Sequence, residues 1–253
     1  AQSLGAAVFF ALGIQFLSLG LRHGDARTGT LIDIGTTALF YWLLSPFYLE
    51  WAYWDSMGLW IFVAVGLFRP ALTANLALEA VRRLGPTLAS TLTSTTPLFA
   101  AIFGVLLLSE ALTLPIIVGT VAVIMGTAVG TATPTTNGQA GRSWPPWALV
   151  FPLGAASLRS VAHVLIRMGL AFAPEPLFAG LIAYSVSFLV ALTAQNWRAN
   201  KQAVNWRNPG LLWFVLAGIS HGFAVWTMNA ALATSPVSVV VPLVSTTPLF
   251  TLL

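Results

Sequence analysis

The hexapeptide Ser-Thr-Thr-Pro-Leu-Phe occupies residues 94–99, and the same six residues recur at positions 245–250. Three further matches occur in the same order at nearly the same offset. Gly85-Pro86 matches Ser235-Pro236, and Gly5-Ala6-Ala7 matches Gly154-Ala155-Ala156. Gly66 matches Gly218, and each of these two glycines is followed three residues later by a basic residue, Arg69 or His221. Four ordered matches at one offset indicate that the two halves of the chain are related.

The composition shows in which solvent these halves fold. Of the 253 residues, 57% are hydrophobic and 7% are charged, whereas a soluble domain carries about 25% charged residues. A helix that spans a bilayer needs about 20 mainly apolar residues. On this criterion we predict eight complete spans and a ninth that is cut short, at residues 4–21, 30–49, 57–81, 86–108, 112–130, 147–170, 177–194, 210–233 and 237 to the end. Continuous apolar runs exclude a membrane β-barrel, whose strands alternate polar and apolar residues.

The matches and the spans together predict the domain organisation. Residues 1–130 form a first repeat of five helices, the polar Pro/Gly-rich stretch 131–146 is a linker, and residues 147–253 form a second repeat that is C-terminally incomplete. Because five is an odd number of crossings, the second repeat enters the membrane from the opposite face. We therefore expect an all-α, ten-helix inverted-repeat (5+5) fold with about eight and a half helices in this chain, as in many secondary carriers.

Several short segments resemble the EamA type of the drug/metabolite transporter superfamily. They are the Pro-bearing helix 84–108, the following Leu-Ser-Glu-Ala-Leu-Thr at 108–113, the glycines Gly119, Gly126 and Gly130, and Asn-Ala-Ala-Leu at 229–232 before Ser235-Pro236. The resemblance implies a ten-helix carrier whose central cavity is lined by the first, third and fourth helices of each half. Bacterial members of this family often export amino acids or other metabolites.

Basic residues inside the predicted spans are the main site candidates, because a charge at mid-bilayer costs at least about 2.5–3.5 kcal/mol. Arg159 lies near the centre of the sixth span, with His163 one turn later. Arg69 lies midway along the third span, before Pro70, which frees the carbonyl of Gly66 and should bend the helix. Each can meet a substrate carboxylate or phosphate. The structural alternatives are a pair between Arg159 and Asp33, and donation by Arg69 to the freed carbonyls.

His221 is the repeat counterpart of Arg69, so we expect it to face Arg69 across the cavity, where it could also carry protons. Hydroxyls before the two repeat prolines can serve a midplane site or repair the kinked backbone. The remaining candidate substrate-binding residues are Ser94, Thr95 and Thr246 from these motifs, with Gln15, Asn75, Trp226 and Asn229.

The other acidic residues receive structural interpretations. We expect Glu79 to pair with Arg82 and Arg83 at the membrane interface, at spacings of three and four residues. Asp33 should lie in the headgroup region. Glu110 should cap the helix that begins near residue 112. No motif of a hydrolase, metalloenzyme or phosphate-binding loop occurs, so we expect no catalytic residues, metal or cofactor.

The sequence thus predicts a secondary transporter that moves small polar metabolites by alternating access, with amino-acid export as the expected activity. Carriers of phosphorylated or nucleotide-linked sugars, a passive channel and an intramembrane lipid-modifying enzyme stay open as alternatives. We expect a monomer that binds a small-molecule substrate and no nucleic acid. Ten Arg against one Lys is typical of GC-rich bacteria, which favours the bacterial inner membrane. The positive-inside rule places the N-terminus outside, whereas the family resemblance implies cytoplasmic ends.

Overall fold

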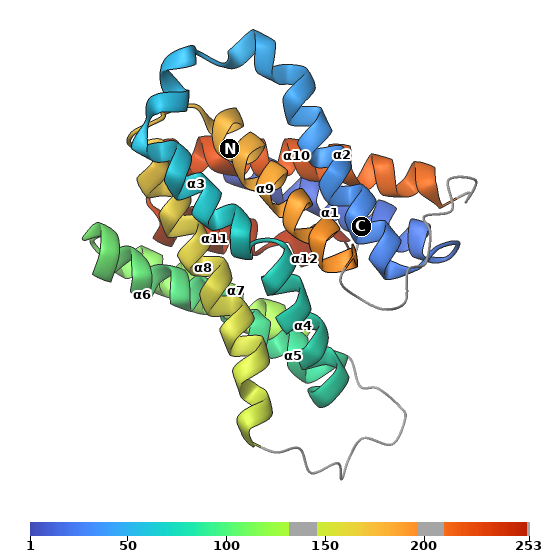
Figure 1. The fold of residues 1–253 in the computed structure, drawn as a ribbon. Helices are drawn as coiled ribbons and strands as arrows, with labels where there is room; N and C mark the ends of the chain where they lie inside the picture. The colour runs from blue at the N-terminus through green and yellow to red at the C-terminus, as the bar shows by residue number, and fades with distance from the viewer. Residues whose placement is uncertain (132–145, 197–209, 252–253) are drawn as a thin grey trace.

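The computed structural model describes residues 1–131, 146–196 and 210–251, and every regular element within these ranges is a helix (Figure 1). The prediction of an all-α membrane fold is confirmed. Five of the helices are long and apolar enough to cross a membrane unaided, as judged by length and composition. Apart from its two end residues, the expected linker 131–146 lies outside the described residues.

The helices of the first half begin and end close to the expected spans. They are α1 (Gln2–Leu21), α2 (Ala26–Tyr48), the 3-10 helix η1 (Trp51–Asp55), α3 (Met57–Phe68), α4 (Ala71–Leu84), α5 (Pro86–Thr93), α6 (Thr96–Leu108) and α7 (Leu114–Thr131). The second half follows the same order. It comprises η2 (Pro146–Leu149), α8 (Val150–Leu170), α9 (Pro176–Asn196), α10 (Leu211–Thr234), α11 (Val237–Val244) and α12 (Thr247–Thr251).

Three expected spans are each divided into two helices. The third span breaks at Arg69-Pro70, between α3 and α4. The two copies of the hexapeptide break the chain alike, between α5 and α6 and between α11 and α12, and Ser94 and Ser245 have the same φ of −68° and ψ of −6°. In both hexapeptides the break precedes the proline, because proline is favoured in the first turn of a helix, where no N–H is needed.

Contacts between the halves are reciprocal. Gly20 of α1 packs against the ring of Phe214 in α10, and Gly169 of α8 packs against Phe62 in α3. The first helix of each half therefore lies on the third helix of the other. A two-fold axis generates paired contacts of this kind.

Hydrogen bonds between the halves follow the same rule. The Thr37 hydroxyl in α2 donates to the carbonyl of Gly218 in α10 at 2.8 Å, and the Ser187 hydroxyl in α9 donates to the carbonyl of Gly66 in α3 at 2.7 Å. In each case a polar side chain on the second helix of one half holds the third helix of the other. Buried bonds at both places fix the separation of the halves.

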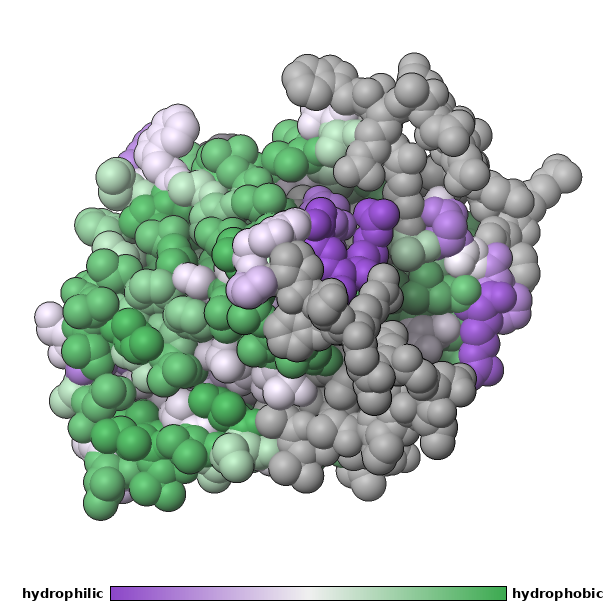
Figure 2. Space-filling view, turned by 90° about the horizontal axis from the view of Figure 1, so that it is seen from below, coloured by the Kyte–Doolittle hydropathy of each residue, from purple (hydrophilic) through white to green (hydrophobic). Residues whose placement is uncertain are grey.

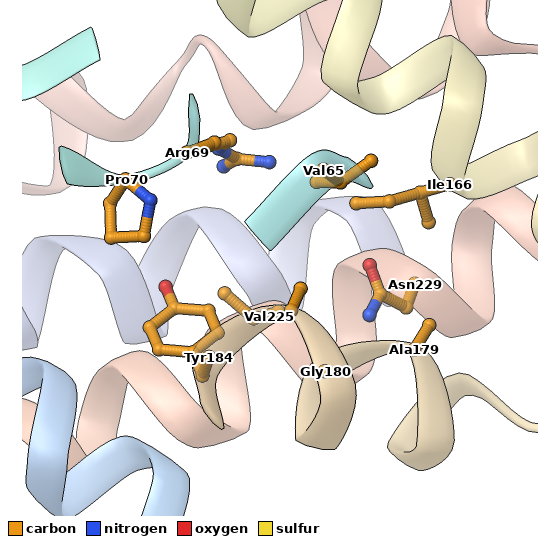
Figure 3. Close-up of a pocket in the computed structure, with 10 residues that line it drawn as sticks. Val65, Arg69, Pro70, Ile166, Ala179, Gly180, Tyr184, Val225 and Asn229 are labelled. Atoms are coloured by element: carbon orange, nitrogen blue, oxygen red, sulfur yellow. The ribbon is translucent and has the colours of Figure 1, made fainter. Parts of the chain in front are cut away.

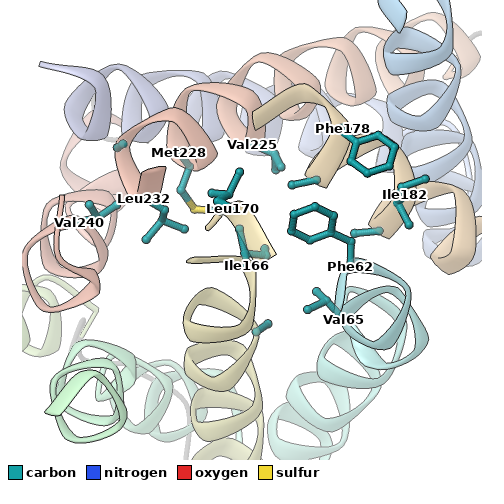
Figure 4. Packing of buried hydrophobic residues seen from close by; sticks show 14 of the residues in the cluster. Phe62, Val65, Ile166, Leu170, Phe178, Ile182, Val225, Met228, Leu232 and Val240 are labelled. Carbon is teal, nitrogen blue, oxygen red and sulfur yellow. The ribbon is translucent and has the colours of Figure 1, made fainter. Parts of the chain in front are cut away.

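The apolar core lies where α3, α8, α9 and α10 meet. Phe62, Ile166, Leu170, Phe178 and Met228 pack together there, as Figure 4 shows. Large apolar side chains also cover much of the surface, for example Leu106, which is 71% exposed, and Leu114, which is 72% exposed. Hydrophobic residues dominate one side of the face shown in Figure 2. Such a surface suits hydrocarbon, where the unfavourable exposure to water is absent.

Candidate functional site

A small pocket lies between α3, α8, α9 and α10, at the break between α3 and α4 (Figure 3). It has room for about one water molecule. Its lining residues come from α3 and the break, α8, α9 and α10, and are Val65, Arg69, Pro70, Ile166, Ala179, Gly180, Ala183, Tyr184, Val225 and Asn229. The third helices of both halves and the first helix of the second half, α8, contribute as expected, whereas α1 contributes no lining residue. The fourth helices contribute no lining residue, and α9, a second helix, takes their place.

The break itself is stabilised by Ser187. Its hydroxyl donates to the carbonyls of both Gly66 and Arg69. Pro70 supplies no N–H to the Gly66 carbonyl, so a donor from another helix must satisfy it. The bend expected at Pro70 is confirmed, and of the two alternatives for Arg69 the structural one does not hold, because Ser187 donates to these carbonyls.

The Arg69 guanidinium is consequently available to the pocket. It lines the pocket beside Pro70, with the hydroxyl of Tyr184 on the opposite wall in Figure 3. Within the described ranges its side chain has no hydrogen bond and no ion pair. A guanidinium carries five donors, and here they are enclosed without a protein acceptor.

Two further basic groups of α8 lie near Arg69. Arg159 is partly buried and interacts electrostatically with Arg69, and both interact with His163. His163 is 4% exposed, and neither of its ring nitrogens has a partner among the described residues. The side chain of Arg159 likewise has no carboxylate or other acceptor in the part of the chain that the structure describes. We call Arg69, Arg159 and His163 the basic cluster.

We expected His221 to face Arg69 across the cavity, but it does not line the pocket. Its Nδ1 lies 2.8 Å from Oδ1 of Asp33 in α2, and the two side chains are 14% and 15% exposed. Asp33 is therefore not in the headgroup region, and it does not pair with Arg159. No acidic partner for His221 could be predicted from local spacing, because the two residues of the pair are 188 positions apart in the sequence.

Tyr184 links the pocket with this pair. It lines the pocket from α9, and its hydroxyl interacts electrostatically with Arg69 and with Asp33. We did not predict a role for it. The available signal was its position, because it is the single tyrosine of the seventh span and lies near its middle.

Asn229 is the one weaker candidate that lines the pocket. Its Nδ2 donates to the carbonyl of Pro176 at 3.1 Å, whereas its buried Oδ1 has no partner among the described residues. Trp226, one turn earlier in α10, packs against Tyr48 and Phe223 instead. An aromatic side chain in that position contributes to packing and not to the pocket wall.

The remaining candidates lie apart from the pocket. The hydroxyls of Ser94, Thr95 and Thr246 donate to carbonyls of their own preceding turns at 2.6–2.7 Å, as the backbone-repair interpretation predicts. Gln15 donates from Nε2 to the carbonyl of Thr251 at 3.1 Å. Asn75 is exposed on α4.

Two glutamates of the first half, Glu79 and Glu110, differ in outcome. Glu79 pairs with Arg83 at 2.6 Å and with Arg82 at 3.3 Å, as predicted. Glu110 does not cap the following helix. Its carboxylate accepts from the N–H groups of Val237 and Ser238 at 2.7 and 3.0 Å, and so caps α11 of the other half. A helix N-terminus attracts a carboxylate whichever segment supplies it.

The two halves of the chain pack reciprocally, and a basic pocket lies between their helices. This arrangement is typical of membrane transporters. No group of three or more His, Asp or Glu side chains suited to a metal ion occurs among the described residues.

Comparison with known proteins identifies the family. The model of the EamA-like transporter family matches residues 2–131, so this chain belongs to that family, a branch of the drug/metabolite transporter superfamily. It is thus an integral, multi-pass membrane protein of a transporter family. A crystal structure titled only "Crystal structure of protein" matches 98% of this chain and 84% of its own, with a TM-score of 0.75 and 16% sequence identity, which supports the fold. No curated protein matches.

Proposed function

We propose that this protein exports amino acids across the bacterial inner membrane as a secondary transporter. The observation that carries the proposal is two partly buried guanidinium groups, Arg69 in the pocket wall and Arg159 near it, for which the described residues supply no acceptor. An unpaired charge inside a membrane is costly unless a ligand, water or partner satisfies it. A substrate carboxylate is the natural ligand, since guanidinium binds it through two parallel hydrogen bonds.

The opposite wall of the pocket suits the other end of an amino acid. The unpartnered Oδ1 of Asn229 and the hydroxyl of Tyr184 can both accept hydrogen bonds from an ammonium group. A zwitterion bound in this way satisfies the two arginines and the amide together. Among the candidate residues, we retain Arg69, Arg159, His163 and Asn229 as the binding site and add Tyr184.

Transport by alternating access follows from the size and position of the pocket. A space for about one water molecule is too small for an amino acid, so the halves must separate before a substrate enters. We propose that residues 1–130 and 147–253 are two repeats that rock about the reciprocal contacts, with 131–146 as the linker, and that no enzymatic step is involved. Such rocking exposes a central site to one side of the membrane at a time.

A carrier of phosphorylated or nucleotide-linked sugars is the second candidate, because a phosphate also satisfies two guanidinium groups. Substrate specificity distinguishes the two. Full-length protein in proteoliposomes should show saturable counterflow of labelled amino acids and little counterflow of sugar phosphates. The reverse preference would support the second candidate, and non-saturating conductance would indicate a channel.

The role of the arginines is tested in the same assay. Arg69→Gln and Arg159→Gln should each lower the counterflow rate at limiting substrate by about 30-fold or more, as expected when one member of a buried charge pair is removed, at about 2–5 kcal/mol. Arg82→Gln is the matched control, since this side chain is exposed at the end of α4. Equal rates for all three variants would exclude the proposed site.

A further inference from the structure

The Asp33–His221 pair lies inside the membrane region but is not part of the pocket wall. Asp33 belongs to α2 of the first half and His221 to α10 of the second, so the pair crosses the interface between the halves. The carbonyl of Asp33 also accepts the hydroxyl of Thr37 at 2.9 Å, and that hydroxyl bonds Gly218 of α10. The pair therefore lies where the two halves are held together.

The geometry of the imidazole leaves Nε2 without a hydrogen-bond partner among the described residues. An ionised carboxylate can only accept hydrogen bonds, so Nδ1, which faces Asp33, carries a hydrogen. Nε2 faces α1, where a Cβ atom added to Gly13 would lie 2.5 Å from it. Phe10 of the same helix packs against the ring. Protonation at Nε2 converts the pair from a net charge of −1 to a neutral ion pair.

The charged and titratable neighbours of the pair lead to the pocket. From α9, Tyr184 interacts with Asp33 and, on its other side, with Arg69 at the end of α3. From α2 itself, Tyr41 donates to the carbonyl of Gly222 at 2.8 Å, one residue after the histidine. The contacts from α1, Phe10 and Gly13, are not titratable. The route from the pair to the basic cluster is therefore Asp33, Tyr184, Arg69.

We propose that His221, held by Asp33, is a proton-binding site whose occupancy is coupled to binding of the substrate's anionic group at Arg69 and Arg159. This inference rests on the proposed function, because it needs an anionic group in the pocket. In the unprotonated pair, the charge of Asp33 partly offsets the arginines and repels a second carboxylate. In the protonated pair, that charge is balanced by His221 and the arginines attract the substrate more strongly.

The sign of the coupling follows. Protonation favours substrate binding, and by reciprocity substrate binding favours protonation. An amino acid and a proton then cross the membrane in the same direction, and outward movement of the amino acid down its gradient takes a proton outward with it. Imidazoles titrate between about pH 5 and 8, a range in which a substrate carboxylate stays ionised.

Counterflow at equal pH on both sides tests the proposal with the amino acid found in the panel. Wild-type apparent affinity should be at least about fivefold higher at pH 6 than at pH 8, the lower end of common coupling energies. Asp33→Asn has no carboxylate charge to offset the arginines, so at pH 8 its affinity should already match the wild-type affinity at pH 6. His221→Gln leaves Asp33 charged at both values, so it should show the wild-type pH 8 affinity throughout.

Two other histidines serve as controls. His23→Gln and His163→Gln should keep the ratio between the pH 6 and pH 8 affinities, whatever their absolute rates. A pH-sensitive dye inside wild-type vesicles should also report acidification when the amino acid enters at zero pH gradient.

The outcomes separate the two proposals. If no amino acid undergoes counterflow in wild-type protein, the proposed function fails. If counterflow occurs but wild-type affinity is equal at the two pH values, or Asp33→Asn keeps the pH dependence, the coupling is overturned. Loss of counterflow in Asp33→Asn also overturns it, because a pair without the carboxylate charge should bind substrate at least as well as wild type.

Discussion

The third helix of the first half and its counterpart in the second half have the same position but different structures. The first is broken into α3 and α4 at Arg69-Pro70, whereas α10 runs without a break from Leu211 to Thr234. Both contain a glycine that accepts a hydroxyl from the opposite half, Gly66 from Ser187 and Gly218 from Thr37. The two sequences differ at the third and fourth residues after each glycine, which are Arg69-Pro70 in one half and His221-Gly222 in the other.

Proline explains that difference. Pro70 cannot continue the backbone ladder, while Gly222 occupies the corresponding place in α10 and keeps its N–H. At the break, the basic residue Arg69 enters the pocket without a partner in the described chain. In the intact helix, the basic residue His221 pairs with Asp33. The break thus accompanies an arginine that lines the pocket, and the intact helix carries a histidine paired with Asp33.

The largest effect is expected from filling the two glycine contacts. A Cβ atom at Gly218 would lie 2.7 Å from the carbonyl oxygen of Asp33, and one at Gly66 would lie 2.6 Å from that of Ala183. Gly218→Ala and Gly66→Ala should each destabilise the protein by about 1–3 kcal/mol, which lowers the melting temperature in detergent by about 2–4 °C per kcal/mol.

The comparison sharpens this prediction, because α10 moves as one body whereas α3 can shift at the break. Gly218→Ala should therefore be the more damaging of the two. Gly119→Ala is the control: no atom lies within 4 Å of an added Cβ there, and alanine is the better helix former by about 1 kcal/mol. A melting temperature lowered equally by all three would argue against the reciprocal contacts.

A smaller difference in stability is expected between removal of the Ser187 hydroxyl and removal of the Thr37 hydroxyl. Ser187→Ala leaves the Gly66 carbonyl without any donor, since Pro70 has no N–H, and should cost about 1–3 kcal/mol. Thr37→Val removes the same kind of bond, but the Gly218 carbonyl retains the ladder donor of a continuous helix, so the cost should be about 0.5–1.5 kcal/mol. Thermal unfolding of the two variants measures the difference, and a larger loss for Thr37→Val would contradict our account of the break.

The sequence predicted the helices well because hydropathy is a local property. The spans, the bend at Pro70 and the equivalence of the two hexapeptides all follow from runs of neighbouring residues. Glu79 was also predicted correctly, since its partners are three and four residues away on the same helix.

Partners across the two halves could not be predicted in the same way. Asp33 and Glu110 each bind residues more than 100 positions away, in the opposite half. Their partners depend on how the halves pack and not on local spacing. Tyr184 was missed for the same reason, because nothing in its own helix indicates that Arg69 and Asp33 lie on either side of it.

The smallest effect should come from the hexapeptides, where the halves are alike. Thr95 and Thr246 donate to carbonyls of their own preceding turns at 2.6 and 2.7 Å, and neither lines the pocket. Thr95→Val and Thr246→Val should each cost about 0.5–1.5 kcal/mol in thermal stability and should change counterflow rates by less than about twofold, because stability and substrate contact are separate here. A tenfold loss of transport in one variant, at unchanged melting temperature, would show that this hydroxyl meets the substrate. It would also show that the two kinks differ in function although Ser94 and Ser245 have the same backbone angles.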